Sequence, residues 1–200
     1  MSDAADVPID ADPTRRLRRW LDDATAAGIP EPGSMCLATT DVAAHPSARM
    51  VLLRGLDQRG LRFYTSYFSR KGRELTDNPR VAAVFHWPVL ERQVRVEGVA
   101  APLSEDESDD YFAARPRGHQ LAAWASEQSE PIESRDVLED RFGHFAARFG
   151  EEEVPRPHSW GGYLITPVRF EFWQACPNRM HDRYEYVRDG VGWRVVRLQP

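Results

Sequence analysis

Along most of the chain, hydrophobic and polar residues alternate with the two-residue period of half-buried β-strands. In residues 91–103, for example, Val94 and Val96 fall on one face, and Gln93 falls on the other. Residues 45–67 predict two strands joined by a turn at Asp57–Gly60. Further strands are predicted at residues 34–41, 80–87, 160–175 and 181–199.

Other segments have the longer period of amphipathic helices. Residues 12–28 place Leu17, Trp20 and Ala24 on one face, Asp12 or Thr14 can cap the start, and Gly28 and Pro30 end the pattern. A short helix is predicted over 69–79, where Ser69 is the N-cap and Pro79 follows the end. Three more helical segments interrupt the strands, at residues 104–116, 118–127 and 133–150.

Six or seven strands with hairpin spacing, interrupted by a helical insert, predict a mostly β fold with added helices (α+β), built on an antiparallel barrel. Strands and helices do not alternate, and neither G-x-G-x-x-G nor a P-loop motif is present, which disfavours a doubly wound nucleotide-binding fold. We expect residues 1–12 to form a disordered acidic tail and residues 13–200 to form a single domain.

Composition narrows the classes of function. A net charge of −5 argues against nucleic-acid binding, and neither a membrane-length apolar run nor a secretory signal is present. Cys36 and Cys176 lack C-x-x-C spacing, and the histidines lack metal-ligand spacing, so we expect a cytoplasmic protein with no metal. Of the 26 basic residues only Lys71 is a lysine, so anion recognition must rely mainly on arginine.

Two segments suggest anion binding. Arg70 and Lys71 lie in the first turn of the helix after Ser69, where cations oppose the helix dipole. A bound phosphate would explain them, and so would a solvated surface pair. Arg49 and Arg54 fall on opposite faces of one strand, where they can reach different anions or extend into solvent. Gln93, at the middle of its strand, can read a polar ring edge or face water.

Two later segments add candidate groups. Tyr111 and Arg115 are four residues apart on one helix face, with His119 beyond them, and could form an oxyanion cradle or an ordinary helix end. If residues 179–183 are extended, Arg179, His181 and Arg183 project from one face and need solvent or an anionic ligand. Trp173 offers a flat apolar wall nearby.

In their order and spacing these segments resemble the pyridoxamine (pyridoxine) 5′-phosphate oxidase family. The resemblance runs from about residue 12 to the C-terminus and is carried by nine segments. They are "RMVLLR", "FYTSYFSRKGREL", "NPRVAAVFHW", "ERQVRVEG", "YFAARPRG", "LAAWASEQS", "WGGY", "EFWQ" and "RMHDR".

The resemblance implies a cytoplasmic homodimer with an FMN-binding split antiparallel β-barrel and one FMN at each of two subunit-interface sites. It implies oxidation of pyridoxine 5′-phosphate or pyridoxamine 5′-phosphate to pyridoxal 5′-phosphate, with O2 as acceptor and H2O2, plus NH3 from the amine, as products. No nucleic-acid or membrane partner is expected.

The resemblance also implies roles for individual residues. Arg179 and His181 would be the catalytic pair that holds the pyridine ring of the substrate, with Arg179 as a clamp and His181 orienting the ring. The substrate phosphate would be held by Arg54, Tyr111, Arg115 and His119. FMN would be held by Arg49, Tyr64, Thr65, Arg70, Lys71, Gln93, Gln128, Ser129, Trp173 and Arg183.

Three departures from the family pattern keep alternatives open. Position 54 is usually Lys and position 119 usually Ser, and the basic segment before the first helix is replaced by the acidic tail. A same-fold FMN-dependent tailoring oxidase of the phenazine-biosynthesis type is therefore an alternative. So are a non-catalytic flavin- or haem-binding split barrel and a structural dimer with an empty barrel, although neither explains the second set of anion-binding residues.

Overall fold

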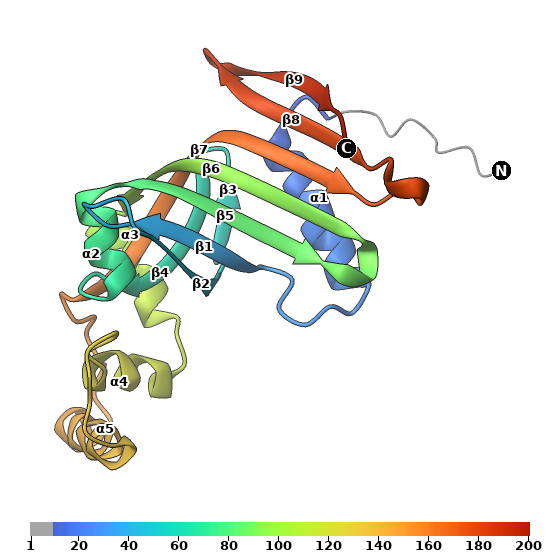
Figure 1. Ribbon diagram of the computed structural model, residues 1–200. Coiled ribbons are helices and arrows are strands. Elements are labelled where there is room, and N and C mark those ends of the chain that lie inside the picture. Colours follow the sequence, from blue (N-terminus) through green and yellow to red (C-terminus); the bar gives the residue numbers. More distant parts are fainter. Residues whose placement is uncertain (1–9) are drawn as a thin grey trace.

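The structure is a computed structural model that describes residues 10–200. Within that range, one antiparallel sheet of nine strands has the order β2-β1-β5-β6-β7-β4-β3, and β8 and β9 extend it beyond β7 (Figure 1). The strands are β1 (Ser34–Thr40), β2 (Pro46–Leu52), β3 (Gly55–Asp57), β4 (Gly60–Ser66), β5 (Arg80–Trp87), β6 (Arg92–Pro102), β7 (Trp160–Gln174), β8 (Asp182–Asp189) and β9 (Gly192–Leu198).

The long strands β6 and β7 give the sheet its curl. The first half of β7 pairs with β4 and its second half with β8, while β6 runs along its other edge. The register shifts opposite Glu97 and Gly98, where Val168 is an extra residue on β7, and a Cβ at Gly98 would lie 2.5 Å from the carbonyl oxygen of Thr166. A bulge of this kind increases local twist, so the sheet closes into a half-barrel.

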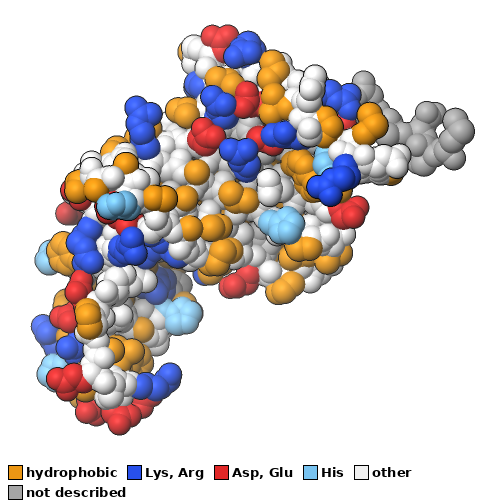
Figure 2. Space-filling model, in the orientation of Figure 1, with side chains coloured by type: hydrophobic (Ala, Val, Ile, Leu, Met, Phe, Trp, Pro, Cys, Tyr) orange, Lys and Arg blue, Asp and Glu red, His pale blue; other side chains and the backbone are white. Residues whose placement is uncertain are grey.

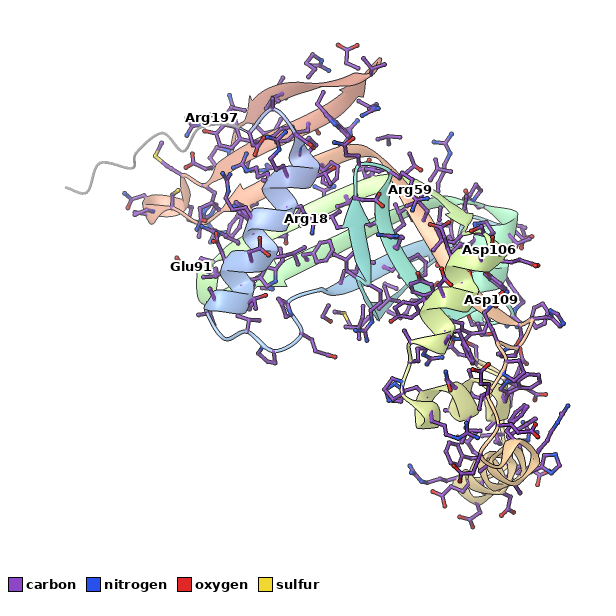
Figure 3. All side chains as sticks on the ribbon, turned by 180° about the vertical axis from the view of Figure 1, so that it is seen from behind. Arg18, Arg59, Glu91, Asp106, Asp109 and Arg197 are labelled. Carbon is purple, nitrogen blue, oxygen red and sulfur yellow. The ribbon has the colours of Figure 1, made fainter. Side chains whose placement is uncertain are left out.

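Five helices surround the sheet within the described residues: α1 (Pro13–Ala26), α2 (Arg70–Asp77), α3 (Glu105–Ala113), α4 (Arg117–Ala125) and α5 (Arg135–Phe149). Helix α1 covers one face of the sheet, as Figures 1 and 3 show from opposite sides. Helices α4 and α5 extend away from the sheet as an arm. Two short 3-10 turns, at Pro88–Leu90 and Pro177–Arg179, complete the elements.

The sequence of α1 explains its place. Asp12 caps the helix by accepting a hydrogen bond from the Thr14 amide at 2.9 Å, and Pro13 occupies the first turn, where its missing N–H costs nothing. Leu17 and Trp20 then face the sheet and join the main core. On the same helix, Arg18 donates to the carbonyl of Leu56 (Figure 3). The predicted helix over 12–28 is confirmed.

A second, smaller core lies between the sheet and the helical arm. It contains Phe112, Leu121, Phe149 and Trp160, and the partly buried Tyr64 and Tyr111 pack against it. This cluster packs α3 and α4 against the start of β7. It thereby sets the position of the residues that follow these two helices. The site described below forms along its edge.

Two strand predictions need correction. The chain leaves the sheet at Leu53 and Arg54, so residues 45–67 form three strands rather than two, and the total within the described residues is nine rather than six or seven. The predicted turn at Asp57–Gly60 is present between β3 and β4. Gly60 has a φ of 145° there, which favours glycine.

The expected acidic tail at residues 1–12 lies mostly outside the described residues. Of its described part, the Asp10 carbonyl accepts a hydrogen bond from the Tyr186 hydroxyl at 2.9 Å. That residues 13–200 form one domain stays a prediction.

The face of the sheet opposite α1 differs in character along the molecule. Figure 2 shows hydrophobic side chains around β1 and β5, and charged side chains of both signs over β7–β9 and on the α4–α5 arm. Edge strand β2 exposes Met50 (62%), and the loop before α2 exposes Phe68 (67%). Large apolar side chains exposed in this way are typical of surfaces that another molecule covers.

Candidate active site

A cleft of about 550 Å³ opens where β2, β4 and the start of α2 meet α3 and α4. Met50, Val51, Leu52 and Trp160 supply apolar parts of its wall. Nine of the predicted site residues also line it: Arg49, Arg54, Tyr64, Thr65, Lys71, Tyr111, Arg115, His119 and Gln128. A volume of this size suits a small organic ligand.

One end of the cleft is built around Lys71. Its side chain is buried, and its Nζ donates to Thr65 Oγ1 at 3.1 Å, to Ser69 Oγ at 3.3 Å and to Gln128 Oε1 at 3.3 Å. No carboxylate of the described residues forms an ion pair with it. Burial, followed by the nearby charge of Arg49, lowers the pKa of Lys71 to about 8. A buried cation that forms no ion pair within the described residues, beside a helix N-terminus, is suited to an anion.

Ser69 places this lysine. Its hydroxyl caps α2 by accepting from the Gly72 amide at 3.3 Å, and it also donates to the Ser66 carbonyl at 2.7 Å. A Cβ at Gly72 would lie 2.1 Å from the Tyr67 carbonyl oxygen, so only glycine lets the first turn of α2 approach the end of β4 this closely. The sequence SRKG thus fixes Lys71 next to Thr65.

Arg49 and Arg70 are both tied to one buried carboxylate, that of Glu74. Arg49 Nη2 lies 3.1 Å from Glu74 Oε2, and Arg70 Nε lies 2.8 Å from Glu74 Oε1. Arg49 lines the cleft, whereas Arg70 is exposed at its margin and does not line it. The sequence predicted neither this ion pair across elements nor the role of Glu74, although the Arg70–Glu74 spacing of four residues was visible.

The other end of the cleft is aromatic and cationic. The rings of Tyr64 and Tyr111 stack with centroids 3.7 Å apart, and Trp160 lies beside Tyr64 at 5.7 Å. A Cβ at Gly162 would lie 2.7 Å from the Tyr64 ring, so glycine on β7 makes room for the stack.

Arg115 completes this end. Its Cζ lies 4.4 Å from the Trp160 ring centroid, and its buried Nη1 has no hydrogen-bond partner among the described residues. Burial lowers the pKa of Arg115; the phenol of Tyr111 opposes that shift and the charge of Arg54 adds to it. His119 lies in the same wall. An unpartnered buried donor next to a second arginine suits an anionic group such as a phosphate.

A second group of predicted residues lies elsewhere, on strands β6, β7 and β8. Gln93 pairs with Trp173, and Trp173 pairs with Arg183, so the three side chains lie in one row across the sheet. The ring of His181 lies 4.6 Å from that of Trp173. None of these residues lines the cleft of the same chain.

Arg183 is held by a second buried carboxylate. Glu171 accepts from Arg183 Nε at 2.9 Å through one oxygen and from Arg95 Nη1 at 2.9 Å through the other. The hydrogen bond from Arg183 to Glu171 raises the pKa of Arg183, so this guanidinium keeps its charge. Sequence reasoning missed Glu171, because its two partners come from two other strands, β6 and β8.

The condition that residues 179–183 be extended is not met. Arg179 ends a 3-10 turn and β8 begins only at Asp182, so Arg179, His181 and Arg183 do not share one strand face. Asn178 and Arg179 have φ values of 58° and 61°, in the left-handed region. Arg179 is exposed, while the His181 Nδ1 accepts from the Cys176 amide at 3.2 Å.

Ser129 is the remaining predicted residue. It follows Gln128 in the loop after α4, is exposed and has a φ of 77°. Its neighbour Gln128 reaches the cleft and accepts from Thr65 Oγ1 at 2.9 Å, whereas Ser129 does not line it. Its predicted contact with FMN stays a prediction.

Comparison with known families decides the classification. A family model described as pyridoxamine 5′-phosphate oxidase matches residues 21–148. A second model, described as the pyridoxine 5′-phosphate oxidase C-terminal dimerisation region, matches residues 160–200. The chain belongs to the pyridoxamine 5′-phosphate oxidase family. The family predicted from the sequence is confirmed, and the two matches together include both groups of predicted site residues.

Relatives of this family are similar over nearly the whole chain. A pyridoxine/pyridoxamine 5′-phosphate oxidase of Rubrobacter xylanophilus is 58% identical over 96% of this chain and 88% of its own length. One of Ralstonia nicotianae is 54% identical over 99% of this chain and 92% of its own length.

Solved structures of the family share the fold. PhzG from Burkholderia lata, solved in complex with tetrahydrophenazine-1-carboxylic acid, is 34% identical, with a TM-score of 0.92 over 100% of this chain and 98% of that one. An FMN-binding protein from Nostoc punctiforme is 17% identical, with a TM-score of 0.76 over 96% of this chain and 100% of that one. The half-barrel is therefore the split barrel that the sequence predicted. In the described part of the chain, no helix is both long and apolar enough to cross a membrane.

Proposed function

We propose that this chain is an FMN-dependent oxidase that converts pyridoxine 5′-phosphate or pyridoxamine 5′-phosphate to pyridoxal 5′-phosphate. The alcohol and O2 would give the aldehyde and H2O2; the amine, O2 and water would give the aldehyde, NH3 and H2O2. The observation that carries the proposal is the cleft itself, which holds two separate sets of anion-binding groups. Relatives that are 50–58% identical and carry this activity in their names support it.

The Lys71 end of the cleft fits the phosphate of FMN. Burial lowers the pKa of the Lys71 ammonium to about 8, and a bound phosphate dianion would stabilise its charged form and raise the pKa toward its ordinary value. Thr65 and Gln128 would fix the ligand beside it, and Arg49 would add a second cation. When bound, FMN supplies a two-electron acceptor that O2 reoxidises.

The Arg115 end fits the phosphate of the substrate. The buried Nη1 of Arg115 has no partner within residues 10–200, and Arg54, Tyr111 and His119 line the same wall. Two guanidinium groups and a phenol match the charge and the donor geometry of a phosphate monoester. Because each end of the cleft would bind one phosphate, FMN and the phosphorylated substrate could be bound at the same time.

The residues that the cleft lacks would come from a second copy of the chain. We propose a homodimer in which Gln93, Trp173 and Arg183 of one subunit face the FMN of the other, and Arg179 and His181 face its substrate. The match of residues 160–200 to a dimerisation region supports this arrangement, because these residues lie in it or pair with it. One isologous interface would create two equal sites.

Catalysis by these residues would rest on orientation. Arg179 would clamp the substrate ring and His181 would orient it, while Trp173 and the apolar wall would exclude water. Correct positioning of two reactants can remove about 7–11 kcal/mol of barrier, so neither Arg179 nor His181 has to act as a strong base.

A tailoring oxidase of the PhzG type is the second candidate. The 34% identity to PhzG and the His119 in the substrate wall favour it. Against it stands Arg115, whose unpartnered nitrogen lies in the same wall as the second guanidinium of Arg54 and is suited to a phosphate rather than to a single carboxylate.

A turnover assay tests the proposal. The purified protein should be yellow, or become yellow with added FMN, and under air it should form pyridoxal 5′-phosphate and H2O2 from at least one of the two phosphorylated substrates. A protein that binds no flavin would remove every flavin-dependent function. A yellow protein inert to both substrates, but reduced by tetrahydrophenazine-1-carboxylic acid, would establish the tailoring oxidase instead.

A further inference from the structure

Glu74 occupies an unusual position for a carboxylate. Its side chain is only 5% exposed, and it lies one turn into α2, paired with Arg49, which lines a cleft whose proposed ligands are anions. A buried negative charge close to a phosphate site repels the phosphate. A carboxylate at this place therefore needs another role that outweighs the repulsion. Its surroundings identify that role.

Four side chains donate hydrogen bonds to Glu74, from three different elements. Thr39 on β1 donates to Oε2, and Ser47 on β2 donates to Oε2 at 2.7 Å. Arg49 on β2 and Arg70 on α2 supply the other two, at 3.1 and 2.8 Å. Burial on its own would raise the pKa of Glu74, but these hydrogen bonds together outweigh it and lower the pKa to about 2. The carboxylate is therefore ionised throughout the physiological range.

The two arginines bound to Glu74 are predicted ligands of FMN. Lys71 follows Arg70 in the first turn of α2 and forms no ion pair with a carboxylate of the described residues. Three cations around the start of one short helix would repel one another before any ligand binds. Glu74 forms ion pairs with the two arginines, and its charge also acts on Lys71 without forming an ion pair with it. It also fixes Arg49 through Nη2, while Nη1 of Arg49 binds the Leu37 carbonyl at 3.2 Å.

We propose that Glu74 is a positioning residue that holds Arg49 and Arg70 in place for the phosphate of the flavin. Glu74 would act through the two guanidinium groups. Among the described residues, Nε of Arg49 and both Nη atoms of Arg70 have no hydrogen-bond partner and can meet the anion. The inference rests on the proposed function, because it assumes that the phosphate lies at the Lys71 end of the cleft.

The test compares two ligands that differ only in the phosphate. FMN and riboflavin are titrated into the flavin-free full-length protein, and binding is followed by the quenching of flavin fluorescence. Glu74→Gln keeps the size and one acceptor oxygen but removes the charge. It should weaken FMN binding about tenfold, which corresponds to about 1.4 kcal/mol, and leave riboflavin binding nearly unchanged.

Glu139→Gln is the matched control. Glu139 forms an ion pair with Arg135 at the same four-residue spacing, at 2.6 Å, on the exposed α5. Its loss should change neither affinity. Ser47→Ala is a second variant, for the case that Glu74→Gln does not fold: it keeps the carboxylate and loosens it, and it should weaken FMN binding in the same direction by a smaller factor.

Two results would overturn the inference. Equal weakening of FMN and riboflavin would show that Glu74 only supports the fold of α2, and tighter FMN binding by Glu74→Gln would show that the carboxylate competes with the phosphate for the arginines. Failure of the proposed function looks different, because the unsubstituted protein would then bind no FMN at all or oxidise neither phosphorylated substrate.

Discussion

Arg115 lies over the indole ring of Trp160 with its Cζ 4.4 Å from the ring centroid, while its buried Nη1 has no partner among the described residues. The packing fixes the guanidinium, and the unused donor points to a ligand. Burying an unpaired charge destabilises the fold, so the buried donor of Arg115 is expected to serve in binding a ligand.

Substitution of Arg115 should therefore separate substrate binding from flavin binding. Charge-assisted hydrogen bonds are worth about 1.5–3 kcal/mol, so Arg115→Met should raise the KM for pyridoxine 5′-phosphate by roughly ten- to a hundredfold. The affinity for FMN should stay unchanged, and the melting temperature should not fall. Steady-state kinetics and thermal unfolding measure these effects.

Arg148→Met is the control for this prediction. Arg148, on α5, has its Cζ 5.7 Å from the ring centroid of Trp124, on α4. This arginine–tryptophan contact lies outside the cleft. Substitution of Arg148 should leave the KM unchanged. A similar rise in KM for both variants, or a loss of flavin from Arg115→Met, would contradict the assignment of Arg115 to the substrate.

The lowered pKa of Lys71 predicts how flavin affinity depends on pH. Its folded pKa of about 8 lies below its ordinary value of 10.5, so the ligand-free folded protein loses this charge as pH rises through about 8. A bound phosphate favours the charged form and raises the pKa again. FMN affinity should therefore fall between about pH 8 and about pH 10, whereas riboflavin affinity should not.

Fluorescence titrations across that range check the prediction, and Lys71→Met supplies the reference. The variant should bind FMN weakly and with no change in this pH interval. If Lys71→Met retained the same fall in FMN affinity, another group would be responsible for it.

Arg179 should be needed for turnover and not for flavin binding. It stands at the end of an exposed 3-10 turn, outside the row formed by Gln93, Trp173 and Arg183. We expect Arg179→Ala to lower kcat/KM at least about a hundredfold, an effect of about 2.7 kcal/mol, with an unchanged flavin spectrum.

Arg188→Ala provides the comparison for Arg179. Arg188 is also exposed, on β8, where it lies 5.1 Å from the Trp193 ring. Its loss should leave kcat/KM unchanged. Release of flavin by Arg179→Ala would place Arg179 at the cofactor instead of the substrate.

The sequence predicted those parts of the fold that depend on local pattern. Asp12, Leu17 and Trp20 define α1, and Ser69 defines the start of α2, because caps and periodicity act over a few residues. The break at Leu53 and Arg54 was missed, because a single glycine after it, Gly55, is an ambiguous signal within a strand pattern.

The sequence predicted which residues belong to the site better than it predicted how they are arranged. The resemblance supplied the residues, and the structure placed nine of them in one cleft. The turn at Asn178 was missed because the alternation of Arg179, His181 and Arg183 imitates a strand. Glu74 and Glu171 escaped notice because their partners come from several elements, which a one-dimensional pattern does not bring together.

The separation of the two residue groups leads to the central claim, that each active site takes one group from each of two subunits. Arg115→Met damages the cleft group and Arg179→Ala damages the other group, so each variant alone should form dimers with two defective sites. A mixed dimer would hold one site with both defects and one site with neither.

Subunit complementation tests this claim most directly. The two variants, carrying different affinity tags, are co-expressed, and the oxidation of pyridoxine 5′-phosphate is measured for the total dimer population. About a quarter of the unsubstituted activity should return, because half of the dimers are mixed and each mixed dimer has one intact site. Mixed dimers that carry both tags and yet remain as inactive as the single variants would contradict a site shared between subunits.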